Sequence, residues 1–389
     1  MKRFHAIHCS PSPYRLHLFK ELYRQLDAKG IDFHVHFMSD MTWGGDERVS
    51  GNGRPRAWAN PRIDFPHTYW RDFGPKAHYF NPGMIWHVRK LNPDWLFIGS
   101  LYDTFTGMLS SRLCTAKVKC AWAEGNTKTP GRITGFLGWF KRFLLSEFQF
   151  VAVPGQDGAS YIQLLQKNCR KQMPKPIFLP NLVDESRFKP REQWEQSRID
   201  EIRSRYLRHA SDKLCLIPAR LEPAKGLLEL IAKLTPNLIK GWRIVIMGQG
   251  GLKDEIDRSL RDKGLTENIV MLSYVPYDEM PVHYAAADLF MLPSIRDPNP
   301  LSVVEALHSG LPVAVSSQTG NVEEAVTDGK NGWRLPVLEE RQYAEVLPRI
   351  FGASADELRD KGKWSKTNNA SFWDTRLSIS KFLDELGVE

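Results

Sequence analysis

Short apolar runs alternate with amphipathic segments along most of the chain. Runs bounded by turn-forming residues are typical of buried strands, and apolar positions three or four apart are typical of helices packed on one face. In the first half, the pattern predicts strands at residues 3–8, 31–37, 95–99, 118–123 and 148–153 and helices at 15–29, 103–113 and 133–147. In the second half, it predicts strands at 213–218, 242–247, 268–272, 288–293 and 312–316 and helices at 226–234, 251–263, 278–286, 301–309 and 322–326.

Two segments interrupt this alternation. Residues 40–82 are rich in Gly, Pro, Trp and Arg, and we expect them to form a long irregular connection of the kind that often carries function. Residues 176–190 read as a strand that runs into turns, followed by a polar helix at 191–207. The sequence therefore predicts one domain at 1–185, a second at 186–370 and a helical segment at 371–389.

Strands that alternate with helices through short connections form parallel sheets. The predicted fold class is therefore α/β, with two Rossmann-like, doubly wound parallel-sheet domains. Ligands of such sheets bind outside the carboxyl ends of the strands, so we expect a site in a cleft between the two domains.

Charge is unevenly divided between the predicted domains. Residues 1–185 hold 25 Lys and Arg against 15 Asp and Glu, a net charge of +10, and the remaining residues hold 28 against 30, a net charge of −2. A basic first domain favours an anionic neighbour, which is a membrane, a nucleic acid or a phosphorylated acceptor. Charge that serves only solubility is the alternative.

The cellular location is expected to be cytoplasmic, with the inner face of the membrane as the more specific alternative. The sequence has no apolar stretch long enough to span a bilayer, and its N-terminus is too polar for a signal peptide. Its five cysteines show no C-x-x-C spacing, which fits a reducing compartment.

One predicted helix, at residues 133–145, is unusually aromatic and carries Lys141 and Arg142. Such a helix can lie on a membrane surface. More often its aromatic stripe is the face that packs on the sheet, and we prefer this second interpretation.

Candidate chemistry centres on residues 293–310, which follow a predicted strand and end in a short helix. A helix N-terminus after a strand binds anions, and the carboxylates of Asp297 and Glu305 can accept hydrogen bonds from hydroxyls. This combination suits a sugar attached to a diphosphate. The structural alternative is that Ser302 and Glu305 form a capping box and that Asp297, before Pro298, belongs to an ordinary turn.

Two cations follow another predicted strand of the second domain. Arg220 offers a planar fork to phosphate oxygens, and Lys225 offers a mobile point charge, so together they can neutralise a diphosphate; two solvated loop cations are the alternative. Gly248 begins a G-x-G turn that lacks a full dinucleotide fingerprint and is better suited to a close approach of nucleotide and backbone. No D-x-D motif is present, so no metal clamp and no cofactor are expected.

The ordered set of motifs in the second domain resembles the retaining GT-B glycosyltransferases of family GT4, also called group 1. The set runs through Arg220 with Lys225-Gly226, Gly248-Gln-Gly, Ser273-Tyr-Val-Pro276, Tyr284 to Ser294, Asp297 with Glu305-Ala, Gly310 to Ser316, Gly320 with Glu324 to Gly329, and Asn331-Gly332. The match is strong over about residues 175–335, including the interdomain segment 178–190, and extends loosely to Pro11-Ser-Pro-Tyr-Arg15.

The resemblance implies a nucleotide-sugar glycosyltransferase that retains the anomeric configuration and acts in glycan, polysaccharide or glycolipid synthesis. It implies catalytic roles for Arg220 and Lys225 on the diphosphate and for Asp297 on the donor sugar. It implies further donor contacts from Glu305 to the ribose, from Asn299, Leu301, Ser302 and Gly248 to sugar and phosphate, and from Tyr274 and Val275 to the base. The final helix would cross back onto the first domain.

Acceptor contacts are assigned to the first domain. Glu124 follows the strand at 118–123 and is expected at the same edge as Tyr14 and Arg15, although it could be a plain surface acid. A glycan or lipid-linked acceptor is expected, with peripheral contact between an anionic membrane and the basic first domain, and no nucleic acid.

Three positions depart from the family pattern. Asp297 stands where Glu is common, Asn299-Pro300 replaces Phe-Gly, and the loop at 9–14 lacks the usual glycines. Pro300 has no backbone N–H to donate. A sugar-nucleotide epimerase of the same fold and a catalytically silent nucleotide-sugar-binding protein are therefore alternatives.

Overall fold

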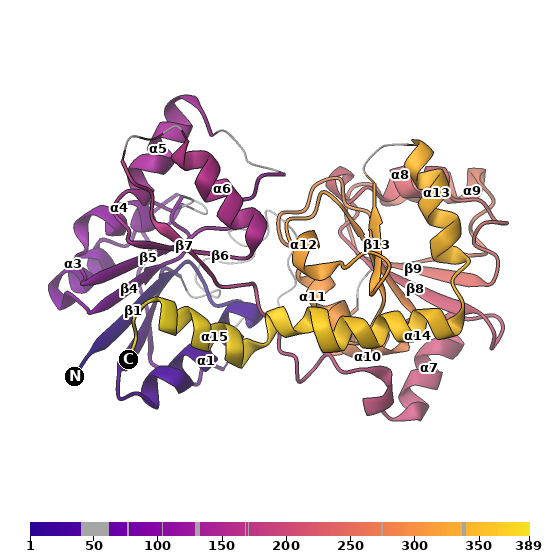
Figure 1. The fold of residues 1–389 in the computed structure, drawn as a ribbon, viewed down its shortest axis with the longest axis horizontal. Coiled ribbons are helices and arrows are strands. Elements are labelled where there is room, and N and C mark those ends of the chain that lie inside the picture. Colours follow the sequence, from indigo (N-terminus) through magenta and orange to yellow (C-terminus); the bar gives the residue numbers. More distant parts are fainter. Residues whose placement is uncertain are drawn as a thin grey trace. The chain divides into compact units, whose positions relative to one another are not determined.

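The computed structural model describes residues 1–39, 62–75, 78–102, 104–128, 133–167, 169, 171–273, 275–336 and 340–389. They form two compact units, coloured along the chain in Figure 1. Unit 1 comprises Met1–Leu182 and Thr375–Glu389, and unit 2 comprises Val183–Asp374.

Unit 1 is built on a seven-stranded sheet in the order β3-β2-β1-β4-β5-β6-β7. Its strands are β1 (Arg3–His8), β2 (Asp32–Phe37), β3 (His67–Tyr69), β4 (Trp95–Ile98), β5 (Val118–Trp122), β6 (Phe150–Val153) and β7 (Lys175–Phe178), and all neighbours pair in parallel. Its longer helices are α1 (Pro13–Asp27), α3 (Pro82–Leu91), α4 (Phe105–Leu113), α5 (Gly135–Leu145), α6 (Gln156–Gln166) and α15 (Thr375–Glu385).

Helices cover both faces of this sheet, as a parallel sheet requires (Figure 1). Side chains of α3, α5 and α6 pack with one face of the strands in a continuous apolar cluster that includes Val88, Leu145 and Ile162. On the other face, α15 lies beside α1, and the ring of Phe382 is 5.3 Å from that of Phe97. The predicted return of the last helix to the first domain is thus confirmed.

Two predictions for unit 1 are wrong. Part of the segment expected to be irregular forms the edge strand β3, which pairs with β2; residues 40–61 of that segment lie outside the described residues. Most of the aromatic stripe of α5 does not pack on the sheet, because Phe136, Trp139 and Phe143 are exposed. Phe140 packs against the apolar cluster beneath, and Gly138, Leu144 and Leu145 supply the buried side of the helix.

Unit 2 is built on a six-stranded parallel sheet. Its strands are β8 (Lys213–Pro218), β9 (Trp242–Met247), β10 (Ile269–Leu272), β11 (Leu289–Leu292), β12 (Val313–Ser316) and β13 (Gly332–Leu335). Its α-helices are α7 (Gln196–Tyr206), α8 (Leu227–Lys233), α9 (Lys253–Asp262), α10 (Met280–Ala286), α11 (Leu301–His308), α12 (Val322–Ala325), α13 (Glu340–Phe351) and α14 (Ala355–Trp364).

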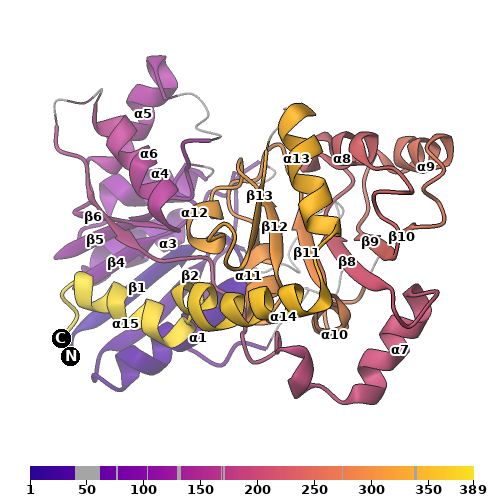
Figure 2. The ribbon, with the colours of Figure 1, turned by 45° about the vertical axis from the view of Figure 1, so that its right-hand side comes forward.

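The order of these strands is β10-β9-β8-β11-β12-β13, which Figure 2 shows from right to left. Strands β9 and β10 therefore follow β8 toward one edge of the sheet, and β12 and β13 follow β11 toward the other. The connections that leave β8 and β11 diverge at this point, and such a switch point is where doubly wound sheets bind ligands. Across the described residues, none of the helices is both long and apolar enough to cross a bilayer.

Candidate active site

The loops that follow β8 and β11 touch at Gly226. This glycine ends a helical turn (Pro223–Lys225) with φ +65°, and a Cβ atom there would lie 2.3 Å from the carbonyl oxygen of Pro293. Arg296 N–H also donates to the carbonyl of Ala224 at 3.0 Å. The positive φ and the lack of space for a Cβ atom both require glycine at residue 226. The close approach also fixes the two loops against each other.

This contact pairs two of the predicted catalytic residues. The ammonium group of Lys225 binds the carboxylate of Asp297, and both side chains are largely buried, with exposures of 15% and 10%. Asp297 is held in turn by the loop after β12, because Gly320 N–H donates to its carbonyl oxygen at 3.0 Å. The predicted diphosphate cation and sugar-binding carboxylate therefore lie together at the switch point.

Arg220 lies on the same loop but has a different partner. Its guanidinium binds Glu222 at 2.9 Å, and its side chain is 55% exposed. Gly248 lies close by, since a Cβ atom there would lie 1.9 Å from the carbonyl oxygen of Ala219. The structure thus places Arg220 and Gly248 at the carboxyl ends of β8 and β9, where Arg220 is available to solvent while Lys225 is not.

Glu305 is buried within α11 and accepts a 2.6 Å hydrogen bond from the hydroxyl of Tyr284. The capping-box interpretation is wrong, because α11 begins at Leu301 with Pro300 as its N-cap, which places Ser302 and Glu305 inside the helix. Tyr284 belongs to the motif set of the sequence, but its role could not be read from the pattern. Sequence reasoning also gave no role to Tyr277, whose pKa is raised to about 12, chiefly by burial; the charge of Glu305 adds to this effect.

The first turn of α11 carries the other predicted donor residues. Leu301 and Ser302 are its first two residues, where helical N–H groups lack intrahelical acceptors. Just before it, the enclosed side-chain Nδ2 of Asn299 has no hydrogen-bond partner among the described residues. Asn321, from the loop after β12, donates to the carbonyl of Pro300 at 3.1 Å and holds the segment that leads into α11. An enclosed amide donor without a partner can bind an oxygen-rich ligand.

The two residues expected near the base are only partly described. Val275 is partly buried in the connection between β10 and α10, and Tyr274 lies outside the described residues.

The predicted acceptor residues gather at the carboxyl edge of the unit 1 sheet. Arg15, in the first turn of α1, binds Glu124 at 2.5 Å and the side-chain oxygen of Asn181 at 2.7 Å. Its guanidinium lies 3.9 Å from the ring centroid of Trp122. Tyr14 is its partly buried neighbour. Asn181 and Trp122 also belong to this cluster. The sequence analysis did not identify them, because both lie far from Arg15 in the chain and no motif links them to it.

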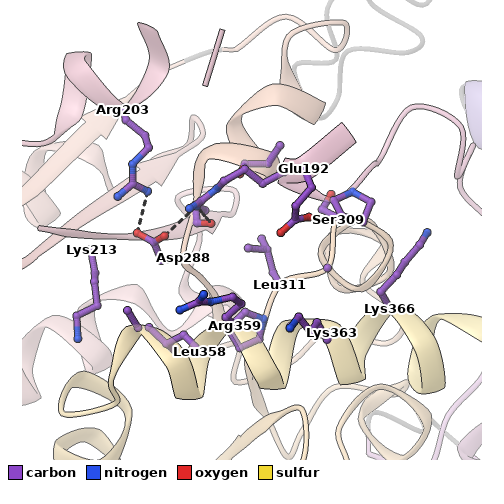
Figure 3. A pocket seen from close by; sticks show the side chains of 18 of the residues that line it. Glu192, Arg203, Lys213, Asp288, Ser309, Leu311, Leu358, Arg359, Lys363 and Lys366 are labelled. Atoms are coloured by element: carbon purple, nitrogen blue, oxygen red, sulfur yellow. Dashed lines mark hydrogen bonds and ion pairs between the residues drawn. The ribbon is translucent and has the colours of Figure 1, made fainter. Parts of the chain in front are cut away.

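A cavity of about 730 Å³ lies at the opposite, amino-terminal edge of the unit 2 sheet (Figure 3). On its wall, Asp288 binds Arg191 at 2.8 Å and Arg203 at 2.9 Å, and both arginines also donate to the carbonyl of Ala286. Lys213, at the start of β8, donates to the carbonyl of Ala353. These groups hold the linker, α7 and the strands together, so this cavity is not the predicted donor site.

Two doubly wound sheets, one of them with a cation–carboxylate pair at its switch point beside a helix N-terminus, define the class of the protein as a GT-B fold. Residues 198–361 match the model of the family described as glycosyl transferases group 1.

Individual relatives agree with this family. A GDP-mannose-dependent alpha-(1-6)-phosphatidylinositol monomannoside mannosyltransferase of Mycobacterium tuberculosis is 31% identical over 197 residues, which are 48% of this chain and 47% of the relative. The putative glycosyltransferase EpsF of Bacillus subtilis is 28% identical over 94% of this chain and 91% of its own length. The first curated relatives are matched over only 20% to 47% of their length.

Solved structures share the fold at low identity. HepE of Anabaena, crystallised with UDP and glucose, superposes with a TM-score of 0.73 at 16% identity and full coverage of both chains. WaaG, a glycosyltransferase involved in lipopolysaccharide biosynthesis, superposes with a TM-score of 0.65 at 15% identity, covering 98% of this chain and 99% of that one.

Proposed function

We propose that this protein transfers a sugar from a nucleotide-diphosphate sugar to a hydroxyl acceptor with retention of the anomeric configuration. The observation that carries the proposal is the Lys225–Asp297 pair, held at the switch point of unit 2 beside the start of α11. A cation and a carboxylate at one helix N-terminus suit a ligand that combines phosphate with hydroxyls.

In this proposal, Lys225 leaves Asp297 when the donor binds and neutralises the diphosphate, with Arg220 as the second, mobile cation. Asp297 then accepts hydrogen bonds from the donor sugar, and Glu305, oriented by Tyr284, accepts them from the ribose. N–H groups of Leu301 and Ser302 and the amide of Asn299 face the sugar and phosphate.

Catalysis consists of positioning and of charge stabilisation as the bond from sugar to diphosphate breaks. The departing diphosphate takes the proton of the acceptor hydroxyl on the face that it leaves, so no protein nucleophile is needed. With two protein cations on the diphosphate, we propose that no metal is required, and activity in EDTA checks this.

The acceptor is proposed to be a glycan, or a lipid-linked glycan at the cytoplasmic face of a membrane. The names of several similar proteins support this, namely a phosphatidylinositol monomannoside mannosyltransferase, an exopolysaccharide phosphotransferase, and WaaG, which is involved in lipopolysaccharide biosynthesis. The net charge of +10 on residues 1–185 supports an anionic acceptor surface. Arg15 and Glu124 are the proposed acceptor contacts.

A thermal-shift panel of nucleotide sugars, including UDP-glucose and GDP-mannose, tests the proposal, because a ligand that binds only the folded state raises the melting temperature. The stabilising compound is then supplied in labelled form with membrane lipid extracts. Label in a glycan supports transfer. Isomerised nucleotide sugar without acceptor would identify an epimerase, and stabilisation without turnover would identify a silent binding protein; either result contradicts the proposal.

A further inference from the structure

Unit 1 exposes a group of large apolar side chains on two adjacent helices. We define the α4–α5 face by six of them: Leu109 and Leu113 on α4, and Phe136, Leu137, Trp139 and Phe143 on α5. Phe136 is 73% exposed and Trp139 is 51% exposed. Exposed apolar side chains that gather on one surface, unlike scattered ones, mark an interaction site.

Contacts among these side chains form one surface. The rings of Trp139 and Phe143 stack at 5.3 Å, and the ring of Phe136 lies 5.7 Å from that of Trp139. Across the helix seam, the guanidinium of Arg112, on α4, lies 3.5 Å from the ring centroid of Phe143 and donates to its carbonyl oxygen. Figure 1 shows α4 and α5 as neighbours.

These exposed side chains do not contribute to covering the sheet. Gly138, Leu144 and Leu145 supply the buried side of α5, and the apolar cluster beneath is already filled by residues of α3, α6 and the strands. The aromatic side is therefore a surplus apolar surface, which in water is unfavourable by an amount proportional to its area.

Charge around the face indicates the kind of partner. Residues 82–147 contain nine Lys and Arg against four Asp and Glu, a net charge of +5, and one of these acids, Glu147, forms an ion pair with Arg112. Lys141 and Arg142 stand on α5 itself, where Lys141 donates to the hydroxyl of Tyr161 and Arg142 donates to the carbonyl of Ile133. Aromatic rings between cationic side chains are typical of helices that lie in the interface of an anionic bilayer, since the rings enter the headgroup region and the cations meet lipid phosphates.

We propose that the α4–α5 face docks unit 1 onto an anionic lipid membrane, with α5 lying in the plane of the interface. This inference deepens the proposed function and rests on it in one respect, namely that a lipid-linked acceptor is reached from the membrane surface. It requires no membrane-spanning helix, and it places the partly buried Lys141 and Arg142 of α5 near lipid headgroups.

The test is flotation of the full chain with vesicles of phosphatidylcholine and phosphatidylglycerol, compared with vesicles of phosphatidylcholine alone. The parent protein is expected to float with the anionic vesicles, more weakly as salt is raised, and its tryptophan emission to shift to the blue. The double variant Phe136→Ser, Trp139→Ser should lower the bound fraction at limiting lipid by about ten-fold or more, because two large rings no longer enter the interface.

Matched controls are Trp364→Ser and Leu377→Ser, which remove exposed apolar side chains outside this face and should float like the parent. A double variant that floats like the parent would overturn the proposal. The proposal would also be overturned if the parent did not bind vesicles but formed a dimer that the double variant did not form. The partner of the α4–α5 face would then be a second copy of the chain. Thermal shifts with UDP-glucose and GDP-mannose on the same preparations report on the donor site separately, so a failed donor site and a failed docking face are distinguished.

Discussion

Lys225 combines two roles that a sequence cannot distinguish. In the ligand-free structure it neutralises Asp297, and in the proposed reaction it neutralises a diphosphate. A largely buried carboxylate needs a cation whenever it is charged, so the pair can be kept for stability alone. Kinetics separate the two roles, because only a transition-state role lowers kcat.

Lys225→Ala is therefore expected to lower kcat by about 10²–10³-fold, the usual effect of removing one group that stabilises developing charge, with a smaller change in donor KM. Lys253→Ala, which removes an exposed lysine paired with Asp257 on α9, is the matched control. Equal kcat in Lys225→Ala and the parent would remove Lys225 from the mechanism.

The buried Tyr284–Glu305 hydrogen bond leads to a second prediction. Tyr284→Phe leaves a buried carboxylate without this donor, so the free energy of unfolding of unit 2 should fall by about 1–3 kcal/mol. Denaturant unfolding measures this change. Tyr206→Phe, which loses only a 3.4 Å contact with His283, should be closer to neutral, and an equal loss in both variants would argue against a special role for Glu305.

At the scale of elements, loops position the site more than helices do. The strands and helices of unit 2 from β8 to α12 were predicted within a few residues, because apolar runs and their spacing mark them directly. Strand β13 and helices α13 and α14 were not predicted. The apolar pattern alone could not show that Lys225 meets Asp297, because their loops are adjacent through the placement of β8 beside β11. Only the resemblance to family GT4 implied that both residues bind one donor.

Gly226→Ala tests this loop contact. The substitution adds a Cβ atom 2.3 Å from the carbonyl oxygen of Pro293 and strains a residue with φ +65°, so it should separate the loops and lower both stability and donor-dependent activity. Gly264→Ala has the same φ with nothing within 4 Å of its Cβ and isolates the backbone strain. If the two variants lose activity equally, contact between the loops is not what matters.

Helix α5 shows why part of the fold escaped prediction. Its sequence has apolar residues on several sides, and the pattern alone does not say which of these sides meets the sheet. The small residue Gly138 allows close approach on one side, and the aromatic rings are left on the other. Similarly, β3 is a three-residue edge strand, too short for an apolar period to appear.

At the scale of the whole molecule, buried histidines link the stability of the fold to pH, and unit 1 holds a cluster of them. Unit 1 buries a row of histidines under α3: His5 Nδ1 lies 2.9 Å from His36 Nε2, and His36 accepts from the indole of Trp70 at 3.1 Å. Burial, followed by the charge of His34, lowers the pKa of His5 to about 4 and that of His36 further. Burial also lowers the pKa of His34, despite Asp32 beside it.

Unit 1 should therefore be acid-labile. The unfolded chain binds protons at these histidines below their ordinary pKa of 6.5, whereas the folded chain does not until a lower pH, so stability is full above pH 6.5 and is lost as the pH falls toward 4. The slope is about 1.4 kcal/mol per pH unit for each such histidine. Denaturant unfolding between pH 7 and pH 4.5 measures it. A slope in His34→Gln as steep as in the parent would contradict this origin.

The position of α15 in the sequence affects the order in which the two units can finish folding during synthesis. Glu385 binds Lys175 of β7 at 3.0 Å, and the carbonyl of Leu386 accepts from the indole of Trp95, so the sheet of unit 1 is closed by residues that the ribosome makes after all of unit 2. Unit 2 can finish folding as soon as Asp374 has emerged. The seven-stranded sheet of unit 1 is translated first, but one flank of β4 and β7 remains uncovered until α15 has been synthesised.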